Sequence, residues 1–284
     1  MMIYQSLQDF LHYEFLLYAL IGTFFLALTC GLISPLIIAR KNAFMGSAIS
    51  HSTLLGLAIA LSLFTSENSL SLFATTLAVT MLCTLFLAFS SYRQKLPTDS
   101  LIGIFYTATM ALGIIIHSLF AKTKTDLLSF LFGNILLLTK EDLYLSLGLL
   151  LVTAPLLLIP FKKWIFLTYD EEGAITSGIN ARLYHYLFFI LLALLIVTSI
   201  KLAGTILIET LLLVPGFFAL KFSSNVKQTF LLSTLFSTFF ALLGIVIANT
   251  YALPSGATLA VVLFVALVLS LSLKKFYNGI RKFI

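Results

Sequence analysis

Long apolar blocks follow one another along most of this chain, and short polar stretches separate them. Each block is about 17–25 residues long, which is the length an α-helix needs to cross the hydrocarbon core of a bilayer. The pattern predicts membrane spans near residues 15–39, 45–64, 69–91, 101–121, 142–161, 183–200, 203–220, 229–249 and 257–273. Because the block at 203–220 is short, the pattern leaves open whether eight or nine spans form.

A shorter apolar stretch at 127–138 contains Gly133 and Asn134. It is too short to cross a bilayer, so it predicts a re-entrant or interfacial segment. Composition agrees with a membrane protein, since 60% of the 284 residues are hydrophobic and 10% are charged, whereas a soluble domain carries about 25% charged residues. We therefore expect an all-α, polytopic integral membrane protein that forms a single domain over residues 1–284.

The basic residues predict how the chain is oriented in the membrane, because Lys and Arg collect in the cytoplasmic loops of membrane proteins. If the N-terminus lies outside and nine blocks cross, 13 of the 17 basic residues face the cytoplasm, and the others are Lys122, Lys124, Lys140 and Lys201. We therefore expect an external N-terminus and a cytoplasmic C-terminus. The basic residues occur singly or in pairs between apolar blocks. They form no basic stripe, which argues against nucleic acid as a partner.

Two ionisable residues are predicted near the middle of the membrane, where such groups are costly and mark functional sites. His51 lies ten residues beyond Lys41, and Glu209 lies eight residues after Lys201. At about 1.5 Å rise per residue, both lie close to the midplane. An imidazole and a carboxylate are ligands for a divalent cation such as Zn, Mn or Fe. The structural alternative is that His51 hydrogen-bonds another helix and that Glu209 is a protonated packing residue.

The longest polar stretch, TYDEEGAITSGINAR, covers residues 168–182 and lies on the predicted cytoplasmic side. It is the largest polar element of the chain, and no water-soluble domain accompanies it. The sequence contains no G-x-x-x-x-G-K-[ST] motif, so it does not predict ATP binding by a P-loop. It also lacks H-E-x-x-H and G-x-S-x-G, so zincin and nucleophile-elbow chemistry have no support. We expect a transport protein rather than an enzyme.

Several segments together resemble the metal-ion permease subunits of ABC importers, the group that includes the bacterial zinc permeases and the manganese/iron permeases. They occur in the family's order and cover nearly the whole chain. The matching stretches are GLISPLIIARKNAFMGSAISHSTLLGLAIAL (31–61), LPTDSLIGIFYTATMALGIII (96–116), DLLSFLFGNILLLTKEDL (126–143), TYDEEGAITSGIN (168–180), KLAGTILIETLLLVPGFFAL (201–220) and LPSGATLAVVLFVALVLSL (253–271).

The resemblance implies a permease of the bacterial inner membrane that moves a divalent transition-metal ion (Zn, Mn or Fe) by alternating access. The metal ion would be its substrate, and no permanently bound cofactor is implied. Its implied partners are a cytoplasmic ABC ATPase subunit that drives transport, an extracytoplasmic metal-binding protein, a second permease copy in a homodimer, and membrane lipid.

The resemblance also implies roles for single residues. The cytoplasmic segment of about 165–182 is similar to the family's coupling helix, which implies docking on the ATPase for Asp170, Glu171, Gly178 and Asn180. A solvated run of charge is the alternative interpretation of this segment. The stretch Gly46-Ser47-Ala48-Ile49-Ser50-His51-Ser52 resembles the family's G-D-x-x-x-H-S pattern of metal ligands.

Ser47 stands where the family usually carries Asp, one helical turn before His51 on the same face. Our hypothesis is that Glu209 supplies the missing carboxylate from a neighbouring span, so the predicted metal site comprises His51, Glu209 and Ser47. The main alternative function is a secondary transporter that uses His51 and Glu209 as a proton or cation relay. An intramembrane enzyme would need a third strong ligand at the same depth, and the sequence offers only these two.

Overall fold

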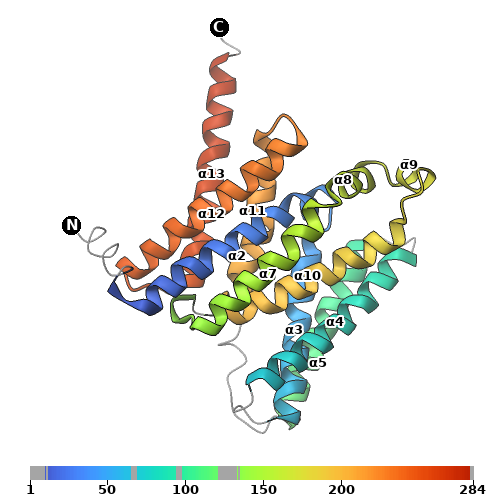
Figure 1. Cartoon of the computed structure of the whole chain (residues 1–284), viewed down its shortest axis with the longest axis vertical. Coiled ribbons are helices and arrows are strands. Elements are labelled where there is room, and N and C mark those ends of the chain that lie inside the picture. The colour runs from blue at the N-terminus through green and yellow to red at the C-terminus, as the bar shows by residue number, and fades with distance from the viewer. Residues whose placement is uncertain are drawn as a thin grey trace. The chain divides into compact units, whose positions relative to one another are not determined.

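The computed structural model describes residues 10, 12–64, 69–93, 98–120, 133 and 135–281. Within these residues, all regular elements are helices (Figure 1). Nine of the described helices are long and apolar enough to cross a membrane: α2 (Glu14–Ala39), α3 (Ala43–Leu63), α4 (Ser69–Arg93), α5 (Thr98–Phe120), α7 (Lys140–Leu158), α10 (Ala181–Ala203), α11 (Thr205–Phe222), α12 (Val226–Thr250) and α13 (Ser255–Arg281). Each matches one predicted block, so the all-α polytopic fold is confirmed.

The short block at 203–220 forms a helix of its own. Only Gly204 separates the last residue of α10 from the first residue of α11, and α11 is 18 residues long. Its length and composition qualify it as a candidate span, which favours nine spans over eight. The re-entrant segment predicted at 127–138 lies largely outside the described residues. Its described part includes the short 3₁₀ helix η1 (Ile135–Leu137).

Two short helices connect α7 to α10. The predicted span at 142–161 ends earlier than expected, because α7 stops at Leu158 and α8 (Phe161–Tyr169) begins after Pro160. Proline has no N–H to donate to a preceding turn, so it favours the start of a new helix at this point. The helix α9 (Glu171–Thr176) follows directly. Figure 1 shows α8 and α9 forming the connection between α7 and α10.

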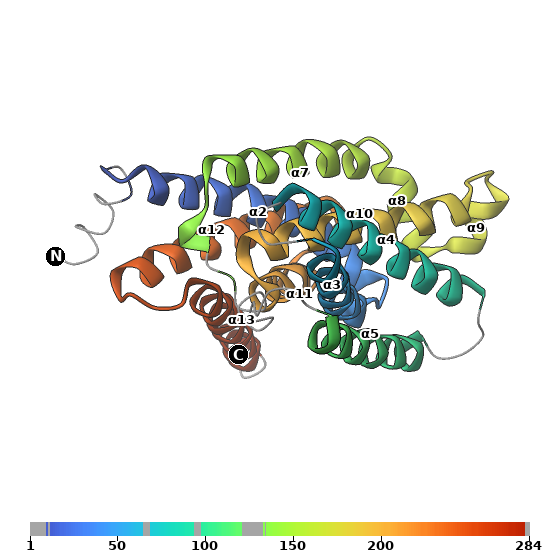
Figure 2. The ribbon, with the colours of Figure 1, turned by 90° about the horizontal axis from the view of Figure 1, so that it is seen from below.

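The chain divides into two compact units. The first unit comprises Met1–Ile38, Phe132–Leu150 and Leu202–Ile284, and the second unit comprises Ala39–Leu131 and Leu151–Lys201. In the first unit, α11, α12 and α13 pack against one another. In the second unit, α3 packs against both α4 and α5, and Figure 2 shows these three helices side by side. Most of α3 is buried as a result.

Hydroxyl groups join α2 to α12 in the first unit. Ser233 Oγ donates a hydrogen bond to the carbonyl of Gly31 at 2.7 Å, and Ser237 Oγ donates to the carbonyl of Ala27 at 2.8 Å. Small polar side chains allow membrane helices to approach closely and bond across their interface, where apolar attraction alone is weak. The serines of α12 therefore help to hold the first unit together.

Ser34 of α2 enters the hydrogen-bond ladder of α11. Its Oγ donates to the carbonyl of Leu212 at 2.6 Å and accepts from the N–H of Gly216 at 2.7 Å. These two backbone groups are four residues apart, so a regular helix would pair them with each other. Pro215, immediately before Gly216, also lacks the N–H that a regular ladder needs. A hydroxyl from one helix thus completes the backbone bonding of another at its proline.

Replacing Ser34 by alanine is expected to destabilise the protein by about 1–3 kcal/mol, because two buried backbone groups of α11 lose their partner. The free energy of unfolding in detergent measures this loss. Ser270→Ala is the matched control, since the Ser270 hydroxyl donates to the Ala266 carbonyl of its own helix. We expect the control to change stability by less than about 0.5 kcal/mol. Equal losses in the two variants would contradict the role of Ser34.

Candidate functional site

His51 lies in the middle of α3, in the second unit, and is partly buried. The Tyr106 ring of α5 meets its imidazole edge to face, with the ring centres 4.4 Å apart and the planes at 85°. Gly113 of α5 allows this approach, since a Cβ there would come within 3.0 Å of the Leu55 backbone nitrogen of α3. Packing of α5 on α3 therefore fixes one side of the His51 ring.

Ser47 lies on the same face of α3 as His51, because α3 is continuous from Ala43 to Leu63 and places the two residues one turn apart. Both are partly buried. The neighbouring Ser52 is buried, and its hydroxyl donates to the Ile49 carbonyl within the same helix at 2.7 Å. The helix thus places Ser47 and His51 one turn apart, and their role as metal ligands stays a prediction.

Glu209 lies near the start of α11, four residues after Thr205, and is partly buried. It belongs to the first unit, whereas His51 and Ser47 belong to the second. The pairing of Glu209 with His51 therefore stays a prediction. Within the described part of the chain, no group of three or more His, Cys, Asp or Glu side chains gathers as a ready metal site. The predicted ligand set is accordingly small: one imidazole, one hydroxyl and one carboxylate.

The predicted coupling residues give α9 its shape. The Asp170 carboxylate caps the start of α9 by accepting a hydrogen bond from the Gly173 N–H at 2.9 Å. Glu171 and Glu172 follow in the first turn, where negative charge favours the positive end of the helix dipole. Both glutamates are exposed. The acidic run is therefore an ordered helical turn that carries two exposed glutamates.

A glycine and an asparagine finish the turn. Gly178 has a φ of 83°, and its N–H bonds to the Ile175 carbonyl at 2.9 Å while the Ile179 N–H bonds to the Ala174 carbonyl at 3.0 Å. This pair of bonds is the Schellman motif, which requires the left-handed conformation that glycine adopts readily. The Asn180 side chain then caps α10 by accepting from the Leu183 N–H at 3.1 Å.

The buried end of this turn is apolar. Leu167, Ala174 and Ala181 form a small core, and Ile179 and Tyr184 pack against it. The contact between Ile179 and Ala174 is the hydrophobic contact that usually accompanies a Schellman motif. Caps at both ends and a core beneath make α9 a rigid element, even though it has only six residues.

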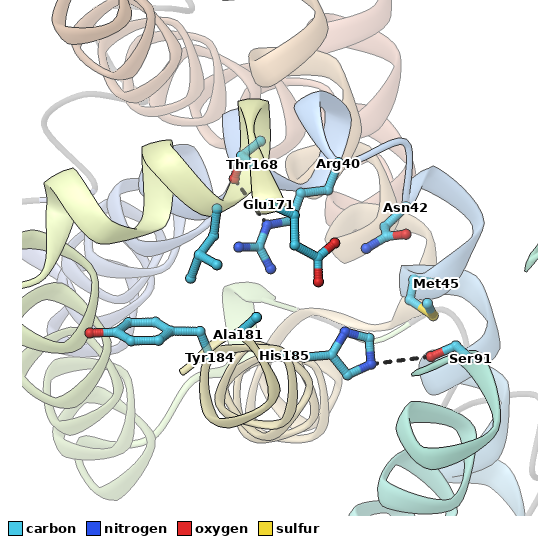
Figure 3. Close-up of a pocket in the computed structure, with 10 residues that line it drawn as sticks. Arg40, Asn42, Met45, Ser91, Thr168, Glu171, Ala181, Tyr184 and His185 are labelled. Atoms are coloured by element: carbon cyan, nitrogen blue, oxygen red, sulfur yellow. Dashed lines mark hydrogen bonds between the residues drawn. The ribbon is translucent and has the colours of Figure 1, made fainter. Parts of the chain in front are cut away.

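A polar cavity of about 230 Å³ lies beside α9, within the second unit. Its lining residues are Arg40, Asn42, Met45, Ser91, Leu167, Thr168, Glu171, Ala181, Tyr184 and His185. Figure 3 shows Arg40, Thr168 and Glu171 on one side of the cavity and the α10 residues Tyr184 and His185 on the other. The His185 ring contacts α4, with Nε2 at 3.1 Å from the Ala88 carbonyl and 3.3 Å from Ser91 Oγ.

Arg40 is the main cation of this cavity. Its Nε–H donates to Thr168 Oγ1 at 3.1 Å. Burial lowers the pKa of the Arg40 guanidinium to about 10. The negative charge of the Glu171 carboxylate acts in the opposite direction and raises this pKa, but its effect is smaller. The group therefore remains positively charged at neutral pH. Nothing in the sequence distinguishes Arg40 from a basic loop residue, because its partners Trp164, Thr168 and Phe188 are more than a hundred positions away.

Nine candidate spans, partly buried polar groups within them and a capped acidic turn between two of them fit a polytopic transport protein of the permease class. The chain belongs to the ABC 3 transport family, whose model matches residues 12–274. This membership confirms the family predicted from the sequence. The chain is therefore a multi-pass membrane subunit of an ABC transport system, not its ATPase, and such a permease works with a separate ATPase and a binding protein.

Known relatives cover most of this chain. It is 31% identical over 252 residues to the manganese transport system membrane protein MntC of Halalkalibacterium halodurans, across 89% of this chain and 85% of that protein. It is 31% identical over 258 residues to the manganese import system permease protein ScaB of Streptococcus gordonii, across 91% of each.

Solved structures share the fold. PsaBC from Streptococcus pneumoniae in complex with Fab matches with a TM-score of 0.81 and 29% identity, across 94% of this chain and 95% of that chain. An inward-facing metal-chelate type ABC transporter matches with a TM-score of 0.72 and 17% identity, across 93% of this chain and 88% of that chain. The second match shows likeness of fold alone.

Proposed function

We propose that this chain is the permease subunit of an importer for a divalent transition-metal ion, with Mn²⁺ as its substrate. The observation that carries this proposal is the 31% identity, over nine-tenths of the chain, to a protein named as a manganese import system permease. The family match over residues 12–274 supports it. Zn²⁺ and Fe²⁺ use similar nitrogen and oxygen ligands, so they are the competing substrates.

The metal ion passes by His51, Ser47 and Glu209. Ser47 and His51 support this role because they share one face of α3. Glu209 adds the carboxylate that the Ser47 position lacks, and carboxylate and hydroxyl oxygens suit Mn²⁺ better than sulfur ligands do. Three weak or moderate ligands hold the ion briefly, which permits release on the opposite side. The ion is cargo, so the protein needs no resident metal.

Residues 1–284 act as one permease domain in the inner membrane of a bacterium, with the N-terminus outside and the C-terminus in the cytoplasm. The distribution of the 17 basic residues supports this orientation. A second copy of the chain completes a homodimer, lipid surrounds it, and an extracytoplasmic binding protein delivers the metal. Alternating access requires two states whose balance the ATPase shifts.

The coupling segment, residues 165–182, docks on the ATPase. Exposed carboxylates at Glu171 and Glu172 on a capped helix support this role. Asp170, Gly178 and Asn180 act by holding the docking shape, since each makes or allows a capping bond. A flexible acidic loop would transmit little of the ATPase's movement to the membrane helices, whereas a capped helix would transmit more of it.

Replacing Asp170 by alanine is expected to weaken ATPase binding about fivefold, because loss of an N-cap costs a short helix about 1 kcal/mol. Titration of the purified permease with the ATPase measures the affinity. Asp170→Asn is the matched control, because an asparagine oxygen can still accept from the Gly173 N–H. Wild-type affinity in the alanine variant would contradict the capping role.

Metal uptake in cells tests the proposed substrate. A bacterial strain without its own manganese importers is given this permease with its ATPase and binding protein, and accumulation of Mn²⁺, Zn²⁺ and Fe²⁺ is measured at equal external concentrations. We expect accumulation of Mn²⁺ to exceed that of the other ions. Accumulation of none of the three, with all subunits present in the membrane, would refute the proposal.

A further inference from the structure

Arg40 links the turn before α3 to the α8–α10 region. Besides its hydrogen bond to Thr168, the guanidinium carbon lies 5.2 Å from the centre of the Trp164 ring and 4.8 Å from that of Phe188. Both rings are fully buried. A planar guanidinium that stacks on two aromatic rings and donates a directed hydrogen bond is held in one orientation.

The partners of Arg40 are themselves anchored. The Trp164 indole N–H donates to the Leu156 carbonyl of α7 at 3.0 Å, and the Thr168 hydroxyl donates to the Trp164 carbonyl at 2.7 Å. The Tyr184 ring of α10 meets Trp164 edge to face, with ring centres 5.0 Å apart. Arg40 thus contacts a framework in which α7, α8 and α10 are tied together. Because these side chains are held by several contacts, a displacement of this framework would also displace Arg40.

On its other side, Arg40 is next to the start of α3. Asn42 precedes the first residue of α3, and Met45 lies in its first turn; both line the same cavity as the guanidinium. The helix continues without interruption to Ser47 and His51. From Ala43 to His51 the distance along the axis is about 12 Å at 1.5 Å per residue. A shift or rotation of the first turn therefore moves the face that carries His51.

We propose that Arg40 is the positioning residue that transmits movement of the coupling segment to α3, so that displacement by the ATPase reorients Ser47 and His51. This inference rests on the proposed function, since it takes residues 165–182 as the ATPase contact and His51 as a metal contact. The Glu171 carboxylate lines the same cavity, on the side of Arg40 and Thr168 (Figure 3).

The test uses the complete complex of permease, ATPase and binding protein in proteoliposomes, with Mn²⁺ as the probe. Uptake and ATP hydrolysis are measured on the same vesicles for the wild type, Arg40→Lys, Arg40→Gln and Thr168→Val. Lys41→Gln is the matched control, because Lys41 is the adjacent basic residue and its side chain is exposed. Arg40→Lys keeps the charge and removes the planar group, so it separates electrostatic from stacking effects.

We expect both Arg40 variants to take up about tenfold fewer ions per ATP hydrolysed, while the ATPase stays bound and the control keeps the wild-type ratio. Thr168→Val should lower the ratio in the same direction, and it carries the test if Arg40→Gln fails to assemble. A purely stabilising role for Arg40 predicts a lower melting temperature with uptake and hydrolysis falling together. An unchanged ratio of ions to ATP in these variants would overturn the inference. Wild-type vesicles that take up no Mn²⁺ would instead overturn the proposed function.

Discussion

Glu209→Gln is expected to reduce Mn²⁺ uptake more than about 100-fold while the permease still folds and binds its ATPase. Loss of a residue that only orients a metal ligand costs about 10–100-fold in affinity or activity, so loss of a ligand costs more. Glutamine has nearly the same shape as glutamate but carries no charge, so packing of α11 should persist. Uptake of radioactive Mn²⁺ by cells that contain the complete complex measures the effect. Glu141→Gln, at an exposed position in the first turn of α7, is the matched control.

A compensating change tests whether Glu209 replaces the carboxylate that is absent at Ser47. Ser47→Asp introduces a carboxylate one turn before His51, on the same face of α3. We therefore expect Ser47→Asp to restore part of the uptake lost in Glu209→Gln. Normal uptake by the single variant Glu209→Gln would refute a metal-contacting role for Glu209. Failure of the double variant to recover any uptake would show that the two positions do not share a function.

Gly216→Ala is expected to destabilise the protein by about 3 kcal/mol, near the upper end of what overpacking usually costs. A Cβ at Gly216 would lie 2.6 Å from the backbone carbon, the carbonyl oxygen and the Oγ of Ser34. Backbone atoms cannot rotate away as a side chain can, so α2 and α11 would have to separate. The separation would also break the two hydrogen bonds through which Ser34 completes the α11 ladder.

Gly148→Ala is the control for this substitution. Gly148 lies inside α7, and a Cβ there would meet no atom within 4 Å. We expect this variant to keep its stability or to gain about 0.5–1 kcal/mol, because alanine favours a helix more than glycine does. Thermal unfolding in detergent compares the two. Similar melting temperatures for Gly216→Ala and Gly148→Ala would show that close contact between α2 and α11 contributes little.

The fold was predictable because the bilayer restricts it strongly. A helix that crosses the hydrocarbon core needs about 20 apolar residues, and all its backbone groups must bond internally. These demands leave apolar blocks of visible length in the sequence, and all nine predicted blocks are helices. The ends of the helices were harder to predict from the sequence. The block at 142–161 hid the break at Pro160, because Ile159 and Phe161 on either side are as apolar as the span itself.

The contacts of Arg40 and Ser34 could not be predicted in the same way. The Ser34 hydroxyl bonds to residues 178 and 182 positions away, and Arg40 reaches Thr168 across 128 positions. Hydropathy records which residues face apolar surroundings, but it carries no information about which helices are neighbours. The pair of Ser47 and His51 was predictable because both lie on one helix, where spacing alone fixes the shared face.

The predicted coupling residues were partly recognisable from the sequence. Family resemblance selected Asp170, Gly178 and Asn180, and the structure gives each a local capping role that sequence rules also recognise. The pairing of Glu209 with His51 depends on how two units of the chain meet, which neither spacing nor capping rules address. The double variant of Ser47→Asp and Glu209→Gln tests that pairing.

We expect ATP, hydrolysed by a partner subunit, to drive metal import through this chain. The most direct measurement is Mn²⁺ accumulation in proteoliposomes that contain the purified complex and carry an imposed proton gradient, with ATP supplied to the ATPase side or omitted and with an uncoupler present or absent. Import driven by the ATPase would give accumulation that requires ATP and is unaffected by the uncoupler. Accumulation that needs no ATP and collapses when the uncoupler removes the proton gradient would contradict it, and would instead favour a secondary transporter with His51 and Glu209 as a proton relay.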